Sequence, residues 1–166
     1  IDNYEIVATN PDETTDARTL AAKIGMLKAV KDYDLKRVIS FHSRVSGAKK
    51  FSEELTEVAD LIEPANRPDG TFLSDYVSGA MKAGDRKDKI DKLKELEGYD
   101  RGILTNARCL AEGVDVPSLD GVAFIDPKGS QVEIIQAVGR AIRKVRGAES
   151  QTKGTIVIPV FIEDGD

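Results

Sequence analysis

The sequence predicts an α/β fold, a three-layer, doubly wound, mainly parallel sheet with helices on both faces. Segments with helical periodicity alternate with short apolar segments along the chain. The apolar segments lack the alternation of a half-buried strand, and such continuous apolar strands are typical of a parallel sheet that is covered on both faces. The chain has 166 residues, of which 40% are hydrophobic, so we expect residues 1–166 to form one domain around one core.

The elements follow from two rules of periodicity. Residues 1–15 are polar and end in a turn-rich stretch, with one short candidate strand at 4–8. Beyond them, apolar residues three or four positions apart predict helices, and short apolar runs predict strands. In chain order these rules give a helix from Asp16, a strand at 37–42, a helix at 46–62, a strand at 71–78, a helix capped by Asp85, strands at 102–106 and 121–126, a helix from Ser130 and a strand at 154–162.

Composition excludes several classes of protein. The chain has 24 Lys and Arg against 29 Asp and Glu, a net charge of −5, which argues against a strongly basic surface but allows a local basic groove. A single cysteine, Cys109, and a single histidine, His42, exclude a disulfide framework and a His/Cys metal cage. Because no apolar run could span a bilayer and no signal segment opens the chain, we expect a cytoplasmic protein without a membrane partner. The start at Ile1 rather than Met suggests an excised piece of a longer protein.

The common phosphate-binding motifs are absent from the sequence. The nearest approach to a P-loop is the segment 79–84 (GAMKAG), but Asp85 and Arg86 follow it where the motif has a lysine and a hydroxyl residue. A carboxylate at that position would repel phosphate, so we interpret the segment as a turn between a strand and a helix. The dinucleotide motif G-x-G-x-x-G is also absent, and His42 lacks the context of a Ser-His-Asp triad.

The predicted helix that begins at Ser130 carries the first candidate site. Gln136, Arg140 and Arg143 are four and three residues apart, so they share one stripe beside the apolar face of the helix. Two guanidinium groups and one amide on one stripe suit a polyphosphate, because arginine offers a fixed fork of donors. A solvated helix flank with ordinary arginines is the alternative interpretation.

The second candidate site is the loop at 110–117, which follows the predicted strand at 102–106. Gly113 permits a tight backbone turn, and Pro117 makes the exit from the loop rigid. Asp115 could accept a hydrogen bond from a ribose hydroxyl. A plain surface loop with a turn glycine and an exposed aspartate is the alternative interpretation.

Four segments resemble motifs of superfamily 2 helicases and translocases, and they occur along the chain in the order that the family has. Residues 136–143 (QAVGRAIR) resemble motif VI, Q-x-x-G-R-x-x-R, and residues 103–117 (ILTNARCLAEGVDVP) are similar to motif V. Residues 37–44 (RVISFHSR) resemble motif IV, and 77–79 (VSG), with Arg86 beyond it, resembles the family's strand, glycine and arginine segment. The pattern L-x-E-G-x-D-x-P within motif V looks more like restriction-type translocases and excision-repair helicases than like DEAD-box proteins.

The resemblance implies the C-terminal, second RecA-like lobe of a two-lobed ATP-hydrolysing motor, with residues 1–15 as a linker from the first lobe. The first lobe of such motors carries the Walker A and DExx motifs, which this sequence lacks. ATP and Mg²⁺ would therefore be bound mainly by that lobe and not by this chain alone, and the isolated chain would be inactive. The expected partners are the N-terminal RecA-like lobe and nucleic acid, with DNA favoured over RNA.

The same resemblance implies roles for single residues. Arg140 and Arg143 would be arginine fingers that stabilise charge on the γ-phosphoryl group, with Gln136 beside it. Nucleotide contacts are expected at Gly113, Asp115 and Gly139. Contacts to the nucleic-acid backbone are expected at Ser43, Arg44, Gly79 and Thr105.

Two other classes of function stay open on the sequence. One is a non-catalytic module that binds nucleic acid or a partner and derives from such a lobe. The other is an unrelated doubly wound domain for a small ligand. Single residues also have structural interpretations: Arg44 as a surface charge, Ser43 as a helix cap, His42 as a packed strand end and Cys109 as a small buried residue.

Overall fold

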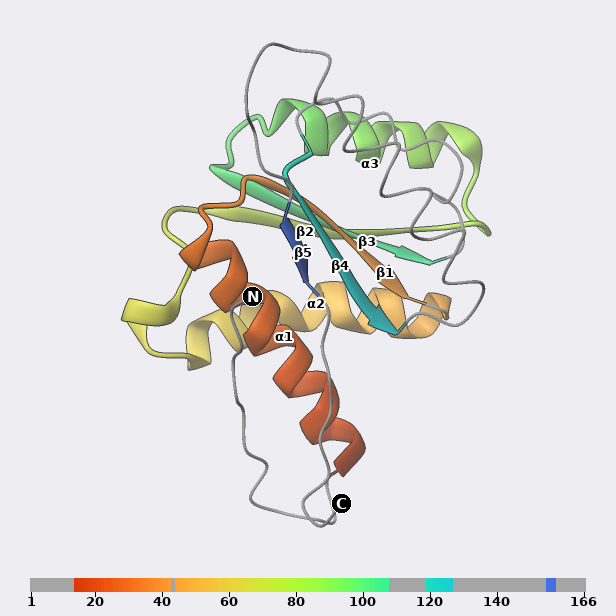
Figure 1. The fold of residues 1–166 in the computed structure, drawn as a ribbon. Helices are drawn as coiled ribbons and strands as arrows, with labels where there is room; N and C mark the ends of the chain where they lie inside the picture. The colour runs from red at the N-terminus through yellow and green to blue at the C-terminus, as the bar shows by residue number, and fades with distance from the viewer. Residues whose placement is uncertain (1–13, 43, 108–118, 127–154, 158–166) are drawn as a thin grey trace.

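The computed structural model describes residues 14–42, 44–107, 119–126 and 155–157. In these residues five strands form one sheet in the order β2-β3-β1-β4-β5, and every neighbouring pair is parallel (Figure 1). The strands are β1 (Arg37–His42), β2 (Phe72–Ser78), β3 (Arg101–Ala107), β4 (Gly121–Asp126) and β5 (Thr155–Val157). The helices are α1 (Thr14–Asp32), α2 (Val45–Leu61) and α3 (Ala83–Glu95), with a 3₁₀ turn at Pro64–Asn66.

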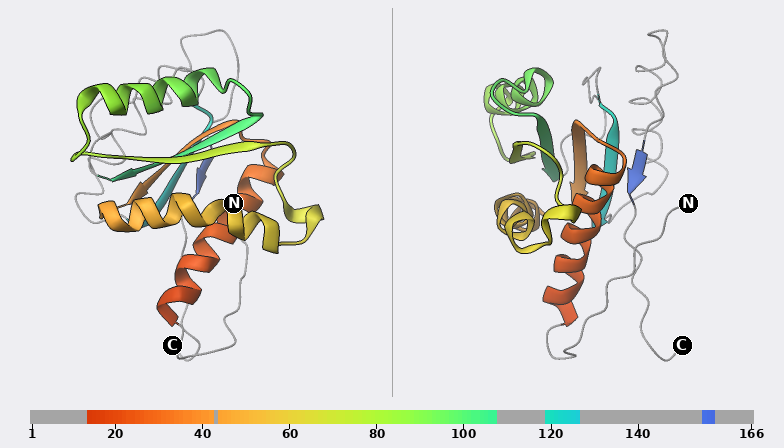
Figure 2. Two further views of the ribbon diagram at one scale, coloured as in Figure 1. Left: turned by 180° about the vertical axis from the view of Figure 1, so that it is seen from behind. Right: turned by 90° about the vertical axis from the view of Figure 1, so that its left-hand side faces the viewer.

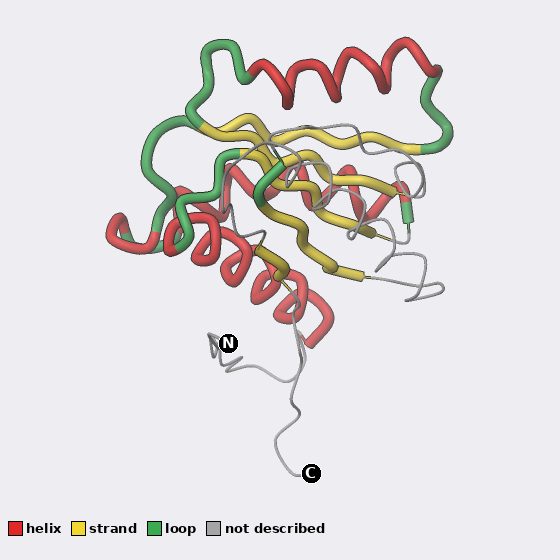
Figure 3. Tube along the Cα trace, turned by 45° about the horizontal axis from the view of Figure 1, so that its top comes forward, coloured by secondary structure: helices red, strands yellow, loops and turns green. Residues whose placement is uncertain are grey.

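Helices cover the sheet on both faces, as the sequence predicts. Alternate residues of a strand point to opposite faces. Val38 and Ile103 belong to one apolar cluster with residues of α1 and α2, whereas their neighbours Ile39 and Leu104 belong to a second cluster with residues of α3. Figures 1 and 2 show α3 on one side of the strands and α1 with α2 on the other, and Figure 3 shows the strands as the middle layer. The predicted three-layer, doubly wound fold is therefore confirmed.

The predicted boundaries agree with the structure to within about two residues. The strands at 37–42 and 121–126 have the predicted limits, because each apolar run is bounded by polar or turn-forming residues. The predicted cap at Asp85 is wrong: α3 begins at Ala83, and Lys82 is its N-cap, so Asp85 lies inside the first turn. A carboxylate in the first turn interacts favourably with the helix dipole without capping the helix. The predicted helix from Ser130, the candidate strand at 4–8 and most of the strand at 154–162 lie outside the described residues.

The amino-terminal edge of the sheet is closed by arginine side chains that bind backbone carbonyls. Arg37 donates from Nε to the carbonyl of Leu93 (3.1 Å) and from Nη2 to that of Lys94 (2.9 Å), so it closes the end of α3. Arg67 closes the end of α2, with Nε 2.9 Å from the carbonyl of Ile62. A cation at a helix C-terminus satisfies orphan carbonyls and complements the dipole.

Arg101 joins three segments at the same edge. Its Nη1 donates to the carbonyl of Leu35 (2.9 Å), its Nε donates to that of Asp69 (2.7 Å), and its Nη2 lies 2.7 Å from Oδ1 of Asp34. Arg101 is only 7% exposed, so these bonds replace the water that the guanidinium loses on folding. Asp120 acts in the opposite sense, because its carboxylate accepts the backbone N–H groups of Lys36 and Arg37 and thereby joins the starts of β1 and β4.

Among the residues that the structure describes, none of the helices combines the length and the apolar composition needed to cross a membrane.

Candidate functional site

Four strands end in one row at the carboxyl-terminal edge of the sheet. The register pairs Ala107 of β3 with both His42 of β1 and Ser78 of β2, and it pairs His42 with Asp126 of β4. The connections that leave these strands therefore start side by side, although they are far apart in the sequence. In open α/β sheets this edge is where ligands bind.

Buried polar groups lie directly beneath this edge. Ser40 and Thr105, which face each other on β1 and β3, have no exposed surface, and their hydroxyl oxygens are 3.1 Å apart. His42 is also buried, and its ring lies against that of Phe51 with centroids 4.6 Å apart. Buried polar groups need hydrogen-bond partners, so this part of the interior is more constrained than the aliphatic core below it.

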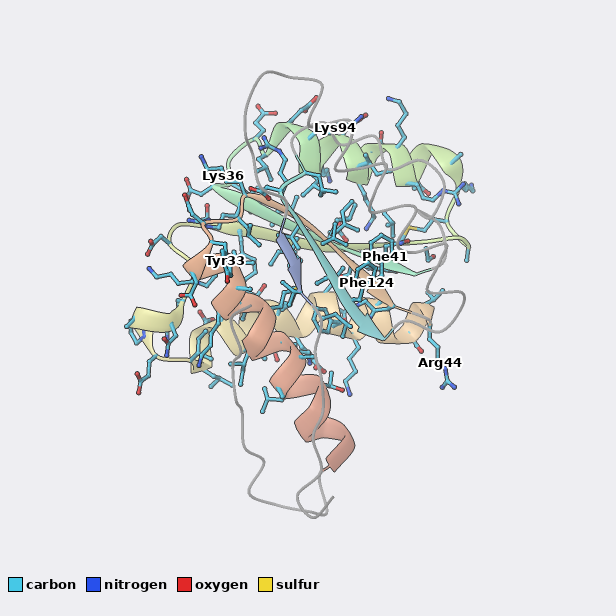
Figure 4. The ribbon with its side chains drawn as sticks, in the orientation of Figure 1. Tyr33, Lys36, Phe41, Arg44, Lys94 and Phe124 are labelled. Carbon is cyan, nitrogen blue, oxygen red and sulfur yellow. The ribbon has the colours of Figure 1, made fainter. Side chains whose placement is uncertain are left out.

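The opposite face of the sheet carries an aromatic pair near the same edge. Phe41 of β1 and Phe124 of β4 stack with ring centroids 5.4 Å apart and ring planes 21° apart (Figure 4). Phe124 belongs to the apolar cluster on the α3 side of the sheet, and the partly buried Phe41 packs against that cluster. The stack holds the last residues of β1 and β4 together from the side opposite the buried hydroxyl pair.

Two helices begin at this edge behind cationic N-caps. Arg44 is the N-cap of α2 and Lys82 is the N-cap of α3, and neither side chain makes a capping hydrogen bond. The first turn of α2 contains no acidic residue. Because the first N–H groups of a helix and its dipole attract anions, Arg44 adds to the positive potential at the start of α2. At the start of α3, the carboxylate of Asp85 in the first turn offsets part of the charge of Lys82. Both N-caps are exposed, and Arg44 projects away from the ribbon beyond the end of β1 (Figure 4).

Carboxyl groups with shifted pKa values lie at the opposite, amino-terminal edge. The hydrogen bond from Arg101, together with its charge, lowers the pKa of Asp34, and hydrogen bonds from the backbone and hydroxyl of Thr71 lower the pKa of Asp100. Burial raises the pKa of Asp120, although the N–H groups of Lys36 and Arg37 oppose that shift. These shifts belong to structural contacts and not to an acid–base pair at the carboxyl-terminal edge.

Of the predicted site residues, the structure brings Arg44 and Gly79 to the same edge. Gly79 is exposed in the turn after β2, where the N–H of Met81 donates to the carbonyl of Ser78 (3.2 Å). Thr105 is fully buried with its hydroxyl on Ser40, so in this structure it does not present its side chain to a ligand. The other predicted residues lie outside the described part of the chain: Ser43, Gly113, Asp115, Gln136, Gly139, Arg140 and Arg143.

Sequence reasoning missed two residues of this edge. Ser40 is a polar residue in the middle of an apolar strand, and that interruption was the available signal. Lys82 stands between an exposed glycine turn and a helix, which was the signal for a cationic N-cap. Within the described ranges no cluster of three or more His, Cys, Asp or Glu residues is placed to hold a metal ion.

Comparison with known proteins agrees with this geometry. The sequence matches the family described as "Helicase conserved C-terminal domain" over residues 22–145. A viral protein named "Putative helicase 22", from Sulfolobus islandicus filamentous virus (isolate Iceland/Hveragerdi), is 26% identical over 121 residues, which is 73% of this chain and 18% of the viral protein.

Solved structures with the same fold include a restriction-modification enzyme and a helicase domain. The structure described as "ATP-dependent Type ISP restriction-modification enzyme LlaBIII bound to DNA" aligns with a TM-score of 0.69 and 31% identity over 90% of this chain and 10% of that chain. "Mss116p DEAD-box helicase domain 2 bound to an RNA duplex" aligns with a TM-score of 0.60 and 21% identity over 85% of this chain and 48% of that chain.

This chain spans less than a fifth of the viral relative and a tenth of the restriction enzyme. The family match extends over most of the chain, and the fold is that of RecA-like C-terminal lobes of superfamily 2 helicases. The chain belongs to the helicase conserved C-terminal domain family.

Proposed function

We propose that this chain is the second motor lobe of an ATP-dependent nucleic-acid helicase or translocase, that it forms one domain over residues 1–166, and that it completes an ATP site on a first lobe. The observation that carries the proposal is the common edge at which four strands end and two helices begin behind cationic N-caps. A motor lobe needs a positive edge that can bind polyphosphate and nucleic-acid backbone, and the exposed cations Arg44 and Lys82 at this edge support the proposal.

The nucleic-acid contacts are assigned to the turns that leave β1 and β2. Arg44 offers a guanidinium fork beside the start of α2, and Gly79 leaves the backbone accessible at an exposed turn. Contacts of this kind bind phosphate and carry no base sequence, which suits movement along a strand. Ser43 is proposed as a further contact, and Thr105 as a positioning residue that holds β3 against β1 beneath the loop.

The nucleotide contacts are assigned to the two candidate segments of the sequence. Arg140 and Arg143 would act as arginine fingers on the γ-phosphoryl group, with Gln136 beside it. Further contacts to the nucleotide are assigned to Gly113, Asp115 and Gly139. Mg²⁺ and most of the ATP are assigned to the first lobe, because the sequence lacks the Walker A and DExx motifs that the first lobe of such motors carries.

DNA is the proposed track. The segment 110–117 follows the L-x-E-G-x-D-x-P pattern that resembles restriction-type translocases. LlaBIII, which shares 31% identity with this chain, was solved bound to DNA. Mss116p, which was solved with an RNA duplex, shares only 21% identity. The non-catalytic binding module stays as the second candidate, because the same cationic edge would serve it without ATP turnover.

The decisive experiment is the substitution Arg140→Ala in the full-length protein. Loss of an arginine finger lowers ATP turnover by about 10³-fold or more, whereas ATP binding changes far less because the first lobe holds most of the nucleotide. DNA-stimulated turnover and the dissociation constant of a fluorescent ATP analogue would be measured together. Lys92→Ala, which removes an exposed cation near the end of α3, is the matched control and keeps the turnover of the unaltered protein.

Two results would contradict the assignment. Near-normal turnover by Arg140→Ala would show that this arginine is no finger. Robust ATP turnover by the isolated 166-residue chain would show that it is not half of a shared site. A full-length protein without any ATP turnover would favour the non-catalytic module.

A further inference from the structure

Strand β2 is the first strand in the order of the sheet and forms one of its edges among the described residues. In the described residues its one strand neighbour is β3. The strand has seven residues, Phe72–Ser78, which is longer than the average strand of about five or six residues. An edge strand turns a row of N–H and C=O groups to solvent and can act as a template for another strand. The sequence of β2 includes the strand-forming residues Phe72, Tyr76 and Val77.

A cluster of three side chains, Asp75, Tyr76 and Lys89, occupies the middle of this edge. The backbone N–H of Tyr76 donates to Oδ1 of Asp75 (2.8 Å), and Nζ of Lys89 donates to the same oxygen (2.6 Å). The same Nζ lies 4.9 Å from the centroid of the Tyr76 ring. We name these residues the edge cluster.

The edge cluster uses a backbone group that another strand would need. Alternate residues of a parallel edge strand turn their N–H groups away from the neighbouring strand. Because Tyr76 gives its N–H to the Asp75 carboxylate, this N–H is one of the outward groups and is already bound from within the chain. A strand added here would have to displace the carboxylate.

The charges of the edge cluster add a second barrier. The side chains of Asp75 and Lys89 are 27% and 23% exposed, so the ion pair still has contact with water. A strand placed over β2 would remove that water, and burial of an ion pair has a desolvation penalty that its attraction does not always offset. Charged groups along an edge are one of the ways in which sheets avoid pairing with each other.

We propose that the edge cluster keeps β2 from pairing with β2 of a second copy of this chain. A second copy is the occupant because two identical edges can pair antiparallel about a two-fold axis, which places each Tyr76 near its symmetry mate and continues the sheet across both copies. The role is separate from the cationic edge of the proposed motor site, since Asp75 and Lys89 take no part in the contacts assigned there.

The test compares Asp75→Thr and Asp75→Asn with Asp91→Asn in the 166-residue chain. Asp75→Thr removes the carboxylate and introduces a strand-forming residue, and Asp75→Asn removes the charge with little change of shape. Asp91 is a matched control, because its carboxylate also pairs with a lysine of α3, Lys87 at 3.0 Å, but both residues of this pair belong to the helix. Analytical ultracentrifugation over a wide concentration range would give the dimer dissociation constant of each variant.

The expected result is that Asp75→Thr dimerises with a dissociation constant at least about tenfold lower than that of the unaltered chain and of Asp91→Asn. Amide hydrogen exchange by NMR would then show slower exchange at the outward N–H groups of β2 in the dimer. If Asp75→Thr does not fold, Asp75→Asn decides the question by the same two measurements. The proposal is overturned if the folded variants sediment like Asp91→Asn, or if they associate without protection of β2.

Discussion

The two edges of the sheet treat helix ends in opposite ways. At the amino-terminal edge, Arg37 and Arg67 donate to the last carbonyls of α3 and α2, so cations stand where the helix dipole is negative. At the carboxyl-terminal edge, Arg44 and Lys82 stand where the dipole is positive, without a capping bond. The comparison teaches that one edge is built for stability, whereas the other keeps a positive potential that an anionic ligand can satisfy.

The energetic difference between the edges follows from the sign of the charge. A cation at a helix C-terminus typically stabilises by about 0.3–1 kcal/mol, and one at an N-terminus opposes the dipole by a similar amount. The chain therefore gives up stability at the carboxyl-terminal edge. A phosphate bound at this edge would attract both the cations and the helix N-termini. Phosphate binding would therefore offset the stability that the protein loses there, which connects this loss to the proposed function.

The largest effect on stability is expected at the amino-terminal edge from Arg101→Ala. The substitution leaves the buried carbonyl of Leu35 without its donor and removes the bonds to Asp69 and Asp34, so the free energy of unfolding falls by roughly 2–4 kcal/mol. The matched variant is Arg44→Ala, which removes an exposed arginine that opposes the dipole of α2 and therefore raises that free energy by about 0.3–1 kcal/mol. Urea denaturation would measure both.

For DNA binding, the expected ranking of the two variants is reversed, because Arg44→Ala has an effect and Arg101→Ala has none. Arg44→Ala makes the slope of log K against log salt shallower by about 0.7–0.9, as for one lost phosphate contact, and a folded preparation of Arg101→Ala keeps the full slope. Equal losses of stability in the two variants would break the comparison between the edges. An unchanged slope in Arg44→Ala would remove this arginine from the proposed interface.

A smaller loss is expected from Gly70→Ala, in the turn before β2. Gly70 has a φ of +81°, and a Cβ there would lie 2.4 Å from Oδ2 of Asp100, whose carboxylate accepts the N–H of Thr71. Strain and collision together lower the free energy of unfolding by about 2 kcal/mol. Gly84→Ala is the control, because a Cβ at Gly84 of α3 meets nothing within 4 Å, and its effect stays within about 0.5 kcal/mol.

The midpoints of thermal unfolding of Gly70→Ala and Gly84→Ala provide a second measurement of the strain at Gly70. Gly70→Ala lowers the midpoint clearly, and Gly84→Ala keeps it or raises it slightly, because alanine reduces the freedom of the unfolded chain. A midpoint for Gly70→Ala equal to that of the unaltered protein would mean that the turn adapts and that Asp100 does not constrain it.

The smallest effect is expected in the pH dependence of Asp100→Asn. Hydrogen bonds from Thr71 hold the pKa of Asp100 below its usual value, so the carboxylate stabilises the folded state at pH values above its unfolded-state pKa. That contribution is lost as the pH falls through the lower, folded-state pKa, in the region below about pH 4. The stability difference between the unaltered protein and the variant therefore narrows on acidification.

Urea unfolding at a series of pH values checks this prediction. A constant difference between the unaltered protein and Asp100→Asn down to the acid limb would show that the Thr71 contact does not favour the charged form. Asp34→Asn removes the carboxylate that Arg101 binds. The stability difference between the unaltered protein and this variant should also narrow as the pH falls.

The local sequence pattern predicted the helices and strands, whereas the side-chain contacts between distant segments could not be predicted from it. The limits of the apolar runs predicted those of β1 and β4. In a sheet covered on both faces, side chains on either side of a strand face the interior, so the strand is a continuous apolar run. The contacts of Arg101 could not be predicted in this way, since Leu35 and Asp69 lie 66 and 32 residues away along the chain.

The candidate site shows the same division. The motif residues Arg44 and Gly79 lie at the edge that the fold class predicts for ligands. Thr105 was expected as a contact, but alternation along β3 places it on the same face as Ile103, toward the core with α1 and α2. Counting along the predicted strand could have indicated this burial, because Ile103 is two residues before it.

The strand order has a consequence for synthesis of the chain. β1 lies between β3 and β4, so the first strand of the sheet to leave the ribosome waits for Gly102 and its neighbours before it gains a hydrogen-bonded partner. Until then, a nascent chain exposes an apolar strand with two open edges, and pairing over such sequence distances is slow. Assembly of this sheet is therefore expected only after β3 has left the ribosome, and β1 is most exposed to wrong pairing in the interval before it.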